Sequence, residues 1–489
     1  MAAVTRNERT WFWALLALAI LLRALNFSAF AMHHPDEVLQ YLEPAYRLLT
    51  GDGIVTWEYR YGMRSWLLPW LLAGPMAVGQ AIGGSWLTGI VAARIAGAII
   101  GIIPVIGAWH LGRRLSPTHG IVAMAAMAVW YEQIVFSTHL LTESLATSLF
   151  IGAAALIDRK EPRAGIVAGG ALLAFAVVFR FHYAVAAGVF VLLAFSNDWK
   201  RWGWLIAGAV PVVLLSCALD LAMGQWPFQW VWTNVQLNLI EGRSARFGLN
   251  EPWFFITAIW GQWGWLTVPI AILAVEAGKQ YRPLLYAAIF NLAVHSLVGH
   301  KEYRFIELTT AALVLLAGIG SVNAWRWLES RRDRAFPSSI TLAALLVAWA
   351  GTSAWLGTGR PLDQWFGRRS TGPELVYAAG RDPRVCGVAG MTVEYWQLSR
   401  TELGRPMPIS LLESASRPAR LKRPGPELAS VNAVIAPTGS ERVLPGYSAT
   451  LCKGNQPYRR CLYVRPGGCA PTPEAEQLEI QRLLLKFDS

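Results

Sequence analysis

Long apolar stretches separated by short polar segments dominate the first 357 residues of the chain. A helix needs about 20 mostly apolar residues to cross the hydrocarbon layer of a membrane. The pattern therefore predicts an all-α polytopic membrane protein with about 11 transmembrane helices. The predicted apolar windows are 11–31, 88–111, 119–137, 142–157, 164–179, 183–196, 203–219, 254–276, 284–298, 305–324 and 338–357.

The basic residues between these windows predict the orientation. With a cytoplasmic N-terminus, the basic loops, including Arg113 and Arg114, fall on the cytoplasmic side, as the positive-inside rule requires. This threading needs one assumption, which is that Trp66–Ile82 lies in or re-enters the outer leaflet without spanning it. Its Pro75 and neighbouring glycines predict a broken or interfacial helix. The first outer loop then covers residues 32–87.

The apolar windows stop near residue 357, and Pro, Gly and Arg become more frequent. We therefore divide the chain into a transmembrane catalytic domain, 1–357, and a C-terminal soluble domain of mixed α/β structure, 358–489. Of the five cysteines, Cys217 lies in an apolar run. The other four fall in the C-terminal domain, without a CxxC pair or a nearby histidine. Disulfides therefore fit them better than zinc, and Cys452 with Cys461 would close a hairpin; the remaining two are Cys386 and Cys469.

The composition of 54% hydrophobic residues excludes an ordinary soluble protein. The net charge of +12 is explained by basic cytoplasmic loops. Because the chain has no basic and aromatic module typical of nucleic-acid binding, we expect no nucleic-acid partner.

Ionisable residues beside membrane spans are costly and mark functional sites. They collect on the predicted outer side, most densely at His33-His34-Pro35-Asp36-Glu37. Pro35 at a first helical position predicts a short helix, with Asp36 and Gln40 on one face. This segment is interpreted as carrying a general base or metal ligands. The alternative is a capped interfacial helix with solvated acids.

Further polar residues lie at the other outer corners. Glu143, Arg180, Asp220 and Asn234 are among them, and the sequence His300-Lys301-Glu302-Tyr303-Arg304-Phe305 separates two apolar helices. Three cationic or titratable residues within five positions suit a phosphate group. The alternative is a basic loop that only sets topology, but basic residues on the outer side run against the positive-inside pattern.

These motifs resemble glycosyltransferase family 22, the GT-C α-mannosyltransferases that extend lipid-linked oligosaccharides and glycosylphosphatidylinositol anchors. His34-Pro-Asp-Glu-x-x-Gln40-x-x-Glu43, with Thr56-Trp57-Glu58-Tyr59 and Arg64, is similar to the first luminal loop of that family. His300-Lys-Glu-x-Arg304-Phe305 is similar to its HKE-x-RF signature, and Asp220 with Gly248-x-x-x-Pro252-Trp253 to its middle segment. The resemblance covers roughly residues 11–325. It departs after Phe305, where the family has a proline and this chain has Glu307-Leu308.

The resemblance implies an inverting mannosyltransferase that uses a polyprenyl-phosphate-mannose donor and a glycolipid or glycan acceptor. Asp36 is then the expected base, with Glu37 second and Glu143 orienting the acceptor or the catalytic loop. Lys301 and Arg304, assisted by His300 and Arg180, would bind the donor phosphate. Other acceptor-binding or donor-binding residues are His34, Gln40, Trp57, Arg64, Asp220 and Asn234. We expect no cofactor and no essential metal, because two cations suffice for a monoanionic phosphodiester; a divalent metal held by the clustered acids is the alternative.

Three other interpretations remain open at the level of sequence: a transferase of another lipid-linked sugar such as arabinose, a membrane transporter, and a non-catalytic scaffold. Transporters usually show inverted repeats and broken helices near the midplane, and the sequence shows neither clearly. The modest length and the absence of a eukaryotic retention signal suggest a bacterial inner membrane. The active site and C-terminal domain would then be periplasmic.

Overall fold

The computed structural model describes residues 6–32, 34–157, 163–196, 198–331, 337–359, 371–414, 426–455, 459–470 and 479–482, together with residues 473 and 476. The chain forms two compact units. One contains Met1–Phe27 and Gly97–Phe366, and the other contains Ser28–Ala96 and Gly367–Ser489. Each unit is described by itself.

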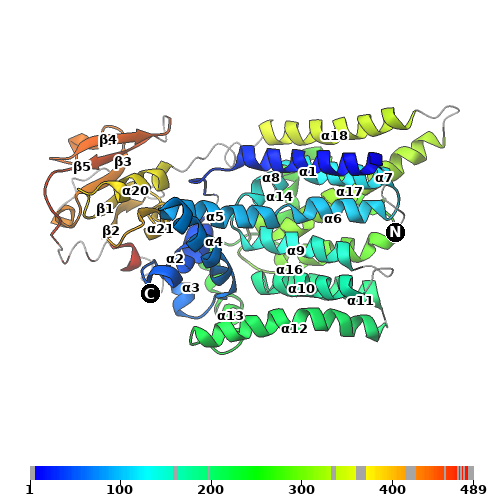
Figure 1. Ribbon diagram of the computed structural model, residues 1–489, viewed down its shortest axis with the longest axis horizontal. Helices are drawn as coiled ribbons and strands as arrows, with labels where there is room; N and C mark the ends of the chain where they lie inside the picture. Colours follow the sequence, from blue (N-terminus) through cyan, green and yellow to red (C-terminus); the bar gives the residue numbers. More distant parts are fainter. Residues whose placement is uncertain are drawn as a thin grey trace. The chain divides into compact units, whose positions relative to one another are not determined.

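The first unit is helical. Figure 1 shows its helices as long rods, among which α9, α10 and α12 lie side by side. Its α-helices are α1 (Arg6–Asn26), α6 (Ile103–Arg113), α7 (Pro117–Val129), α8 (Tyr131–Ser137), α9 (Thr142–Leu156), α10 (Arg163–Phe179), α11 (Tyr183–Phe195), α12 (Trp199–Ala222), α13 (Gln229–Asn234), α14 (Phe254–Trp263), α15 (Thr267–Val275), α16 (Arg282–Ser296), α17 (Glu307–Glu329) and α18 (Ser338–Gly359).

Every apolar window of the sequence coincides with one or two helices. Among the described residues, five helical segments are long and apolar enough to cross a membrane, or six if the bent pair α7–α8 counts as one. Other windows form apolar helices of 10 to 17 residues, which include α9, α10 and α11. The chain is thus an integral membrane protein with multiple apolar helices. The larger number of about 11 spans stays a prediction.

Glycines allow two of these helices to pack closely. A Cβ atom on Gly208 of α12 would overlap the Val167 carbonyl oxygen of α10, and one on Gly170 would overlap the Leu205 carbonyl oxygen of α12. Small residues let helix backbones approach where lipid offers no hydrophobic drive for association. These two positions therefore fix the α10–α12 contact.

The helical path breaks between α7 and α8 with a bend of 61°. Such a break leaves backbone groups without helical partners, which is costly at membrane depth. The Ser353 hydroxyl of α18 supplies hydrogen-bond partners for the backbone groups at this break. Its Oγ accepts a hydrogen bond from the Tyr131 backbone N–H at 2.9 Å and donates one to the Val129 carbonyl at 2.6 Å. The bend is therefore stabilised by a third helix.

The second unit combines the first loop with a sheet. Its strands are β1 (Val388–Val393), β2 (Ile409–Ser414), β3 (Ala433–Pro437), β4 (Ser448–Lys453) and β5 (Arg460–Val464), labelled in Figure 1. The strand order is β2-β1-β3-β5-β4, with β1 parallel to β2 and β3, and β5 antiparallel to β3 and β4. The C-terminal domain is therefore mixed, as the sequence predicts. The helices of this unit are α2 (Glu43–Thr50), α3 (Trp57–Arg60), α4 (Leu67–Gly83), α20 (Thr371–Arg381), α21 (Arg400–Leu403) and most of α5 (Trp86–Ile100).

The first loop and the sheet share one hydrophobic core. Leu39 and Ile54 are buried in the same cluster as Val388 of β1 and Ile435 of β3. Hydropathy alone did not predict this grouping, because it assigns 32–87 to the membrane domain. The segment Trp66–Ile82 forms most of α4, which continues through Pro75 without a break. Its position relative to a membrane stays a prediction.

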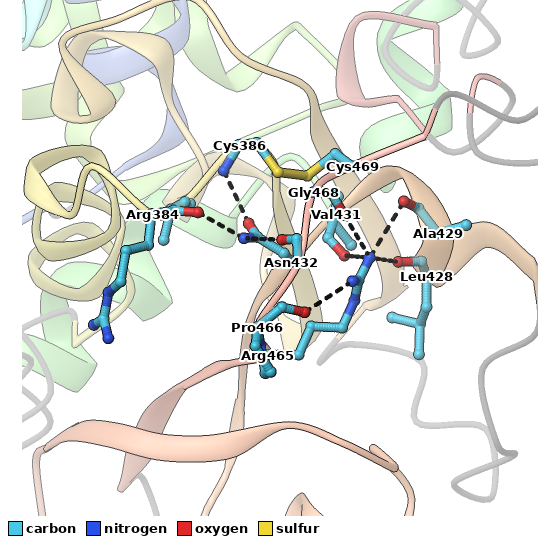
Figure 2. The surroundings of a disulfide bond; sticks show 12 residues. Arg384, Cys386, Leu428, Ala429, Val431, Asn432, Arg465, Pro466, Gly468 and Cys469 are labelled. Carbon is cyan, nitrogen blue, oxygen red and sulfur yellow. Dashed lines mark hydrogen bonds between the residues drawn. A yellow bond between two sulfur atoms is a disulfide. The ribbon is translucent and has the colours of Figure 1, made fainter.

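Two disulfides join Cys386 to Cys469 and Cys452 to Cys461, so the expectation of disulfides is confirmed. The second pair lies directly across β4 and β5. Figure 2 shows the surroundings of the first pair. There the Asn432 side chain accepts from the Cys386 backbone N–H at 2.9 Å and donates to the Arg384 carbonyl at 2.7 Å. The Arg465 guanidinium binds neighbouring backbone carbonyls, including that of Gly468 at 3.1 Å. These polar contacts fix both ends of the disulfide.

Candidate functional site

The first-loop motif becomes helical at Pro35, as the sequence predicts, and continues as a π-helix over Glu37–Leu42. The sequence predicts an ordinary short helix here. The structure instead places wider π-helical turns, which insert an extra residue and often occur at functional sites. The Asp36 backbone N–H donates to His34 Nδ1 at 3.2 Å, and the Asp36 carboxylate lies 3.3 Å from the same nitrogen. His34 and Asp36 are therefore held together at the start of the π-helix.

The two adjacent acids of this motif have different environments. The Glu37 side chain is fully buried, and its Oε1 accepts a hydrogen bond from the His34 backbone N–H at 3.2 Å. The Asp36 side chain is 16% exposed. Asp36 is therefore the acid of this pair that a reactant reaches more readily. His33 of the same motif lies outside the described residues.

Glu58 organises the polar side chains behind this motif. Its Oε1 accepts from Gln40 Nε2 at 2.6 Å and from Arg64 Nη2 at 3.0 Å. Burial disfavours the charge of Arg64, but the carboxylates of Glu58 and Asp36 outweigh it and raise the Arg64 pKa above its usual range. The sequence predicts Gln40 and Arg64 as site residues. Glu58, although it stands in the Thr56-Trp57-Glu58-Tyr59 motif, was not among the predicted site residues.

Two aromatic residues adjoin this cluster. The Tyr59 hydroxyl donates to the Gln40 backbone carbonyl at 2.6 Å. This hydrogen bond joins α3, which contains Tyr59, to the π-helix. Burial and the carboxylates of Asp36 and Glu58 raise the pKa of Tyr395 to about 12. Tyr395 comes from the C-terminal domain, so its position near these acids had no signal in the sequence. Trp57 is half-buried and meets the Tyr61 ring edge-on.

A second cluster lies in the helical unit around Glu143, in the first turn of α9. The buried Glu143 carboxylate pairs with Arg180 Nη1 at 3.2 Å and Arg304 Nη1 at 3.0 Å. The guanidinium of Arg180 lies over the Phe305 ring at 4.5 Å. The structure thus joins Glu143, which the sequence predicts to orient the acceptor or the catalytic loop, to Arg180 and Arg304, which it predicts to bind the donor phosphate.

Glu302 completes this second cluster. Its Oε2 accepts from Arg304 Nε at 2.6 Å, and its Oε1 lies 2.9 Å from His300 Nε2. The Arg304 guanidinium therefore lies between two carboxylates, Glu143 and Glu302. Glu302 belongs to the quoted signature but was not named as a site residue. Its role here is to orient the cation next to it.

Lys301 has a different setting from Arg304. Its ammonium donates to the Val298 carbonyl at 2.5 Å and to the Asn250 carbonyl at 2.9 Å. Burial lowers its pKa, while the more distant Glu251 raises it. Within the described part of the chain Lys301 forms no ion pair, so its charge is balanced by the two carbonyl dipoles and by the field of Glu251. The Asn250 side chain also donates to the Lys301 carbonyl at 3.3 Å, which joins this segment to the one before α14.

Asp220 and Asn234 make other contacts. Asp220 Oδ2, at the end of α12, accepts from the Phe228 backbone N–H at 3.0 Å, which closes the turn that follows. Asn234 Oδ1 accepts from Asn238 Nδ2 at 3.1 Å. Neither has a contact with the Glu143 cluster among the interactions of the described residues. Their expected part in binding substrate stays a prediction.

The described residues hold no group of three His, Cys, Asp or Glu side chains close enough to bind a metal ion. The two clusters offer a partly exposed carboxylate and fixed cations. A partly exposed acid can accept a proton, and paired guanidinium groups can stabilise an anion.

Comparison of whole structures defines the class of protein. The fold is similar to that of ArnT from Cupriavidus metallidurans in its crystal structure bound to undecaprenyl phosphate. The TM-score is 0.59 at 14% identity, and the match covers 95% of this chain and 99% of ArnT. The fold is therefore the GT-C architecture.

The family follows from the sequence comparison. Residues 10–356 match the Alg9-like mannosyltransferase family, and the chain belongs to this family. It is 23% identical over 346 residues to the human GPI alpha-1,2-mannosyltransferase 3, covering 67% of this chain and 61% of the relative. It is 26% identical over 306 residues to the Arabidopsis thaliana mannosyltransferase APTG1, covering 58% of this chain and 54% of that protein. The chain thus spans less than two thirds of these curated relatives.

Proposed function

We propose that this protein is an inverting mannosyltransferase that uses a polyprenyl-phosphate-mannose donor. The observation that carries the proposal is the match of residues 10–356 to the Alg9-like mannosyltransferase family. Undecaprenyl phosphate bound to ArnT, which has the same fold, supports a lipid-phosphate donor. The acceptor is the hydroxyl group of a glycolipid or a glycan.

The reaction forms a bond between the acceptor oxygen and the anomeric carbon of mannose. The bond from that carbon to the phosphate oxygen breaks, and the polyprenyl phosphate leaves with the electron pair. The acceptor proton goes to Asp36, whose carboxylate is partly exposed and held beside His34. Glu37 is the second candidate, but its full burial favours a structural role.

The departing phosphate gains negative charge in the transition state, and fixed cations stabilise it. Arg180 and Arg304 serve this purpose, and Glu143 and Glu302 hold their guanidinium groups in place. Lys301 supplies a third charge without a carboxylate partner among the described residues. His300 assists through its contact with Glu302.

The remaining assignments concern binding and orientation. The acceptor or the donor sugar is contacted by Gln40, Arg64, His34 and Trp57. Glu58 holds the first two of these side chains in place. Asp220 and Asn234 take part in the same binding through the loop after α12. The active site and the C-terminal domain face away from the cytoplasm, with the N-terminus inside, and the two disulfides support an oxidising compartment such as the periplasm. The functional division remains a catalytic domain, 1–357, and a C-terminal domain, 358–489.

The test is transfer of radiolabelled mannose from polyprenyl-phosphate mannose by the purified protein, beside Asp36→Asn. The variant should lose at least about 100-fold in rate, because the general base is gone while donor binding remains. Asp198→Asn, at the start of α12, is the matched control and should transfer normally. Normal turnover by Asp36→Asn would remove Asp36 as the base. Transfer only from an arabinose donor would replace the sugar, and no donor binding at all would favour a transporter or a scaffold.

A further inference from the structure

Glu132 is a fully buried carboxylate that accepts four hydrogen bonds from aromatic side chains. Its Oε2 accepts from the Trp130 indole N–H at 3.0 Å. Its Oε1 accepts from the Tyr131 hydroxyl at 3.1 Å and from the Trp263 indole N–H at 3.1 Å. The fourth donor is the Tyr303 hydroxyl at 2.5 Å. A buried carboxylate is tolerated only when its hydrogen-bonding capacity is met, and here four donors meet it.

The donors come from three parts of the helical unit. Trp130 and Tyr131 stand at the break between α7 and α8, where the chain bends by 61°. Trp263 ends α14, and its ring meets the Trp130 ring edge-on at 5.7 Å. Tyr303 lies within the His300–Phe305 segment. Glu132 therefore joins the helix break to that segment.

Tyr303 connects the hydrogen bonds of Glu132 to the Glu143 cluster, because it stands between Glu302 and Arg304 in the sequence. Its neighbours Glu302 and Arg304 direct their side chains to each other and, for Arg304, to Glu143. The Tyr303 side chain goes to Glu132 instead. Three consecutive residues of the segment are thus held by contacts that involve carboxylates, and losing the Glu132 contact removes the anchor of the residue that precedes Arg304.

We propose that Glu132 is a positioning residue, which fixes the orientation of Arg304 through Tyr303. The proposal rests on the proposed function in one respect, because it assumes that Arg304 binds the donor phosphate. It assigns Glu132 no contact with substrate. The sequence places Glu132 in a mostly apolar window, where an isolated acid alone gives no partner.

Three variants separate positioning from general stability. Tyr303→Phe removes one donor to Glu132 Oε1 and keeps the ring. Trp263→Phe removes another donor to the same oxygen and replaces the buried indole with a smaller phenyl ring. Glu132→Gln replaces one accepting oxygen with an N–H group that opposes a donor. If Glu132 positions Arg304 through Tyr303, then Tyr303→Phe and Glu132→Gln should raise the KM for polyprenyl-phosphate mannose or lower kcat, with a combined loss on the order of 10- to 100-fold in kcat/KM. Trp263→Phe should lose much less activity, although its loss of thermal stability should be at least as large because the smaller ring leaves a cavity.

A structural readout keeps the test independent of the transfer reaction. Hydrogen–deuterium exchange of the peptide containing residues 299–306 should increase in Tyr303→Phe and Glu132→Gln and stay near wild type in Trp263→Phe. Equal exchange in all four proteins, or equal activity losses in the two single-donor variants, would overturn the proposal. If exchange changes as expected but the wild type transfers no mannose, the positioning role stands and the proposed function fails.

Discussion

Glu43 of the first loop and Thr401 of the C-terminal domain share two hydrogen bonds, although 358 residues separate them. Glu43 Oε1 accepts from the Thr401 backbone N–H at 2.8 Å and from its hydroxyl at 2.9 Å. The other oxygen of Glu43 accepts from the Ile54 N–H at 2.7 Å. The neighbouring Arg400 pairs with Asp52 at 2.8 Å. The C-terminal domain therefore helps to fix the loop that carries Asp36.

Thr401→Val tests this attachment. The substitution keeps the shape of the side chain and removes the hydroxyl donor to a buried carboxylate, which should lower the free energy of unfolding by about 1.5–3 kcal/mol. Mannose transfer should fall with it, because the Asp36 loop loses part of its support. Thermal unfolding and transfer rate are the measurements. Thr438→Val, whose hydroxyl lies 3.7 Å from the Cys461 sulfur, is the control. Equal effects of both variants would contradict the role of the Glu43 contact.

Glu402 predicts a dependence of stability on pH. Burial, with Glu43 nearby, raises its pKa from 4.5 to about 8, although Arg94 lowers it. Between these two values the folded protein keeps a proton that the unfolded chain has released. Stability should therefore fall as the pH rises from about 4.5 to 8, by up to about 1.4 kcal/mol per pH unit from this group.

Glu402→Gln should make the melting temperature of this unit less dependent on pH over that interval, because an amide mimics the protonated acid. Thermal unfolding of the purified protein at pH 5, 6.5 and 8 measures the effect. Glu374→Gln, at a surface pair with Lys453, controls for loss of a carboxylate. A pH profile of Glu402→Gln parallel to that of wild type would show that Glu402 ionises at its ordinary pKa.

Arg304→Lys should impair both stability and catalysis. The guanidinium reaches Glu143 and Glu302 with different nitrogens, and a lysine ammonium cannot reproduce this geometry. Because lysine keeps the charge and loses one of these charge-assisted contacts, the free energy of unfolding should fall by about 1.5–3 kcal/mol. We expect an increased KM for the donor as well. Arg243→Lys is the matched control, because its pair with Glu241 is partly exposed and should contribute less than about 1 kcal/mol. Unchanged donor kinetics in Arg304→Lys would argue against phosphate binding by this residue.

The disulfide between Cys386 and Cys469 closes a loop of 83 residues. Replacing both cysteines with serine should lower the free energy of unfolding of the C-terminal domain by about 2–5 kcal/mol. Limited proteolysis and thermal unfolding, with and without reductant, measure this loss. Cys217→Ser controls for cysteine removal, since Cys217 is a free thiol in α12. Reductant should destabilise the wild type more than the double variant, in which only the Cys452–Cys461 disulfide remains to be reduced. An equal effect of reductant on both proteins would contradict a stabilising role of the Cys386–Cys469 disulfide.

The apolar pattern of the sequence determined where the helices lie, and its local motifs indicated the family. Runs of about 20 apolar residues have few stable alternatives to membrane helices, because backbone groups in lipid must bond within their own segment. The helices therefore follow the predicted windows, from α1 to α18. The local motifs were equally informative: the first-loop motif, the middle segment and His300–Phe305 together predicted the family that the comparison then showed.

Only the tertiary structure decided which distant residues meet. The pairing of Glu143 with Arg180 and Arg304, and of Glu43 with Thr401, depends on how helices and loops pack, and no local periodicity encodes it. The same holds for Lys301, whose expected role as a free phosphate ligand did not anticipate its two backbone carbonyl partners. Glu132 shows the limit most clearly. An acid in an apolar window signals that partners exist, but Trp263 and Tyr303 lie 131 and 171 residues away, and only packing brings them to it.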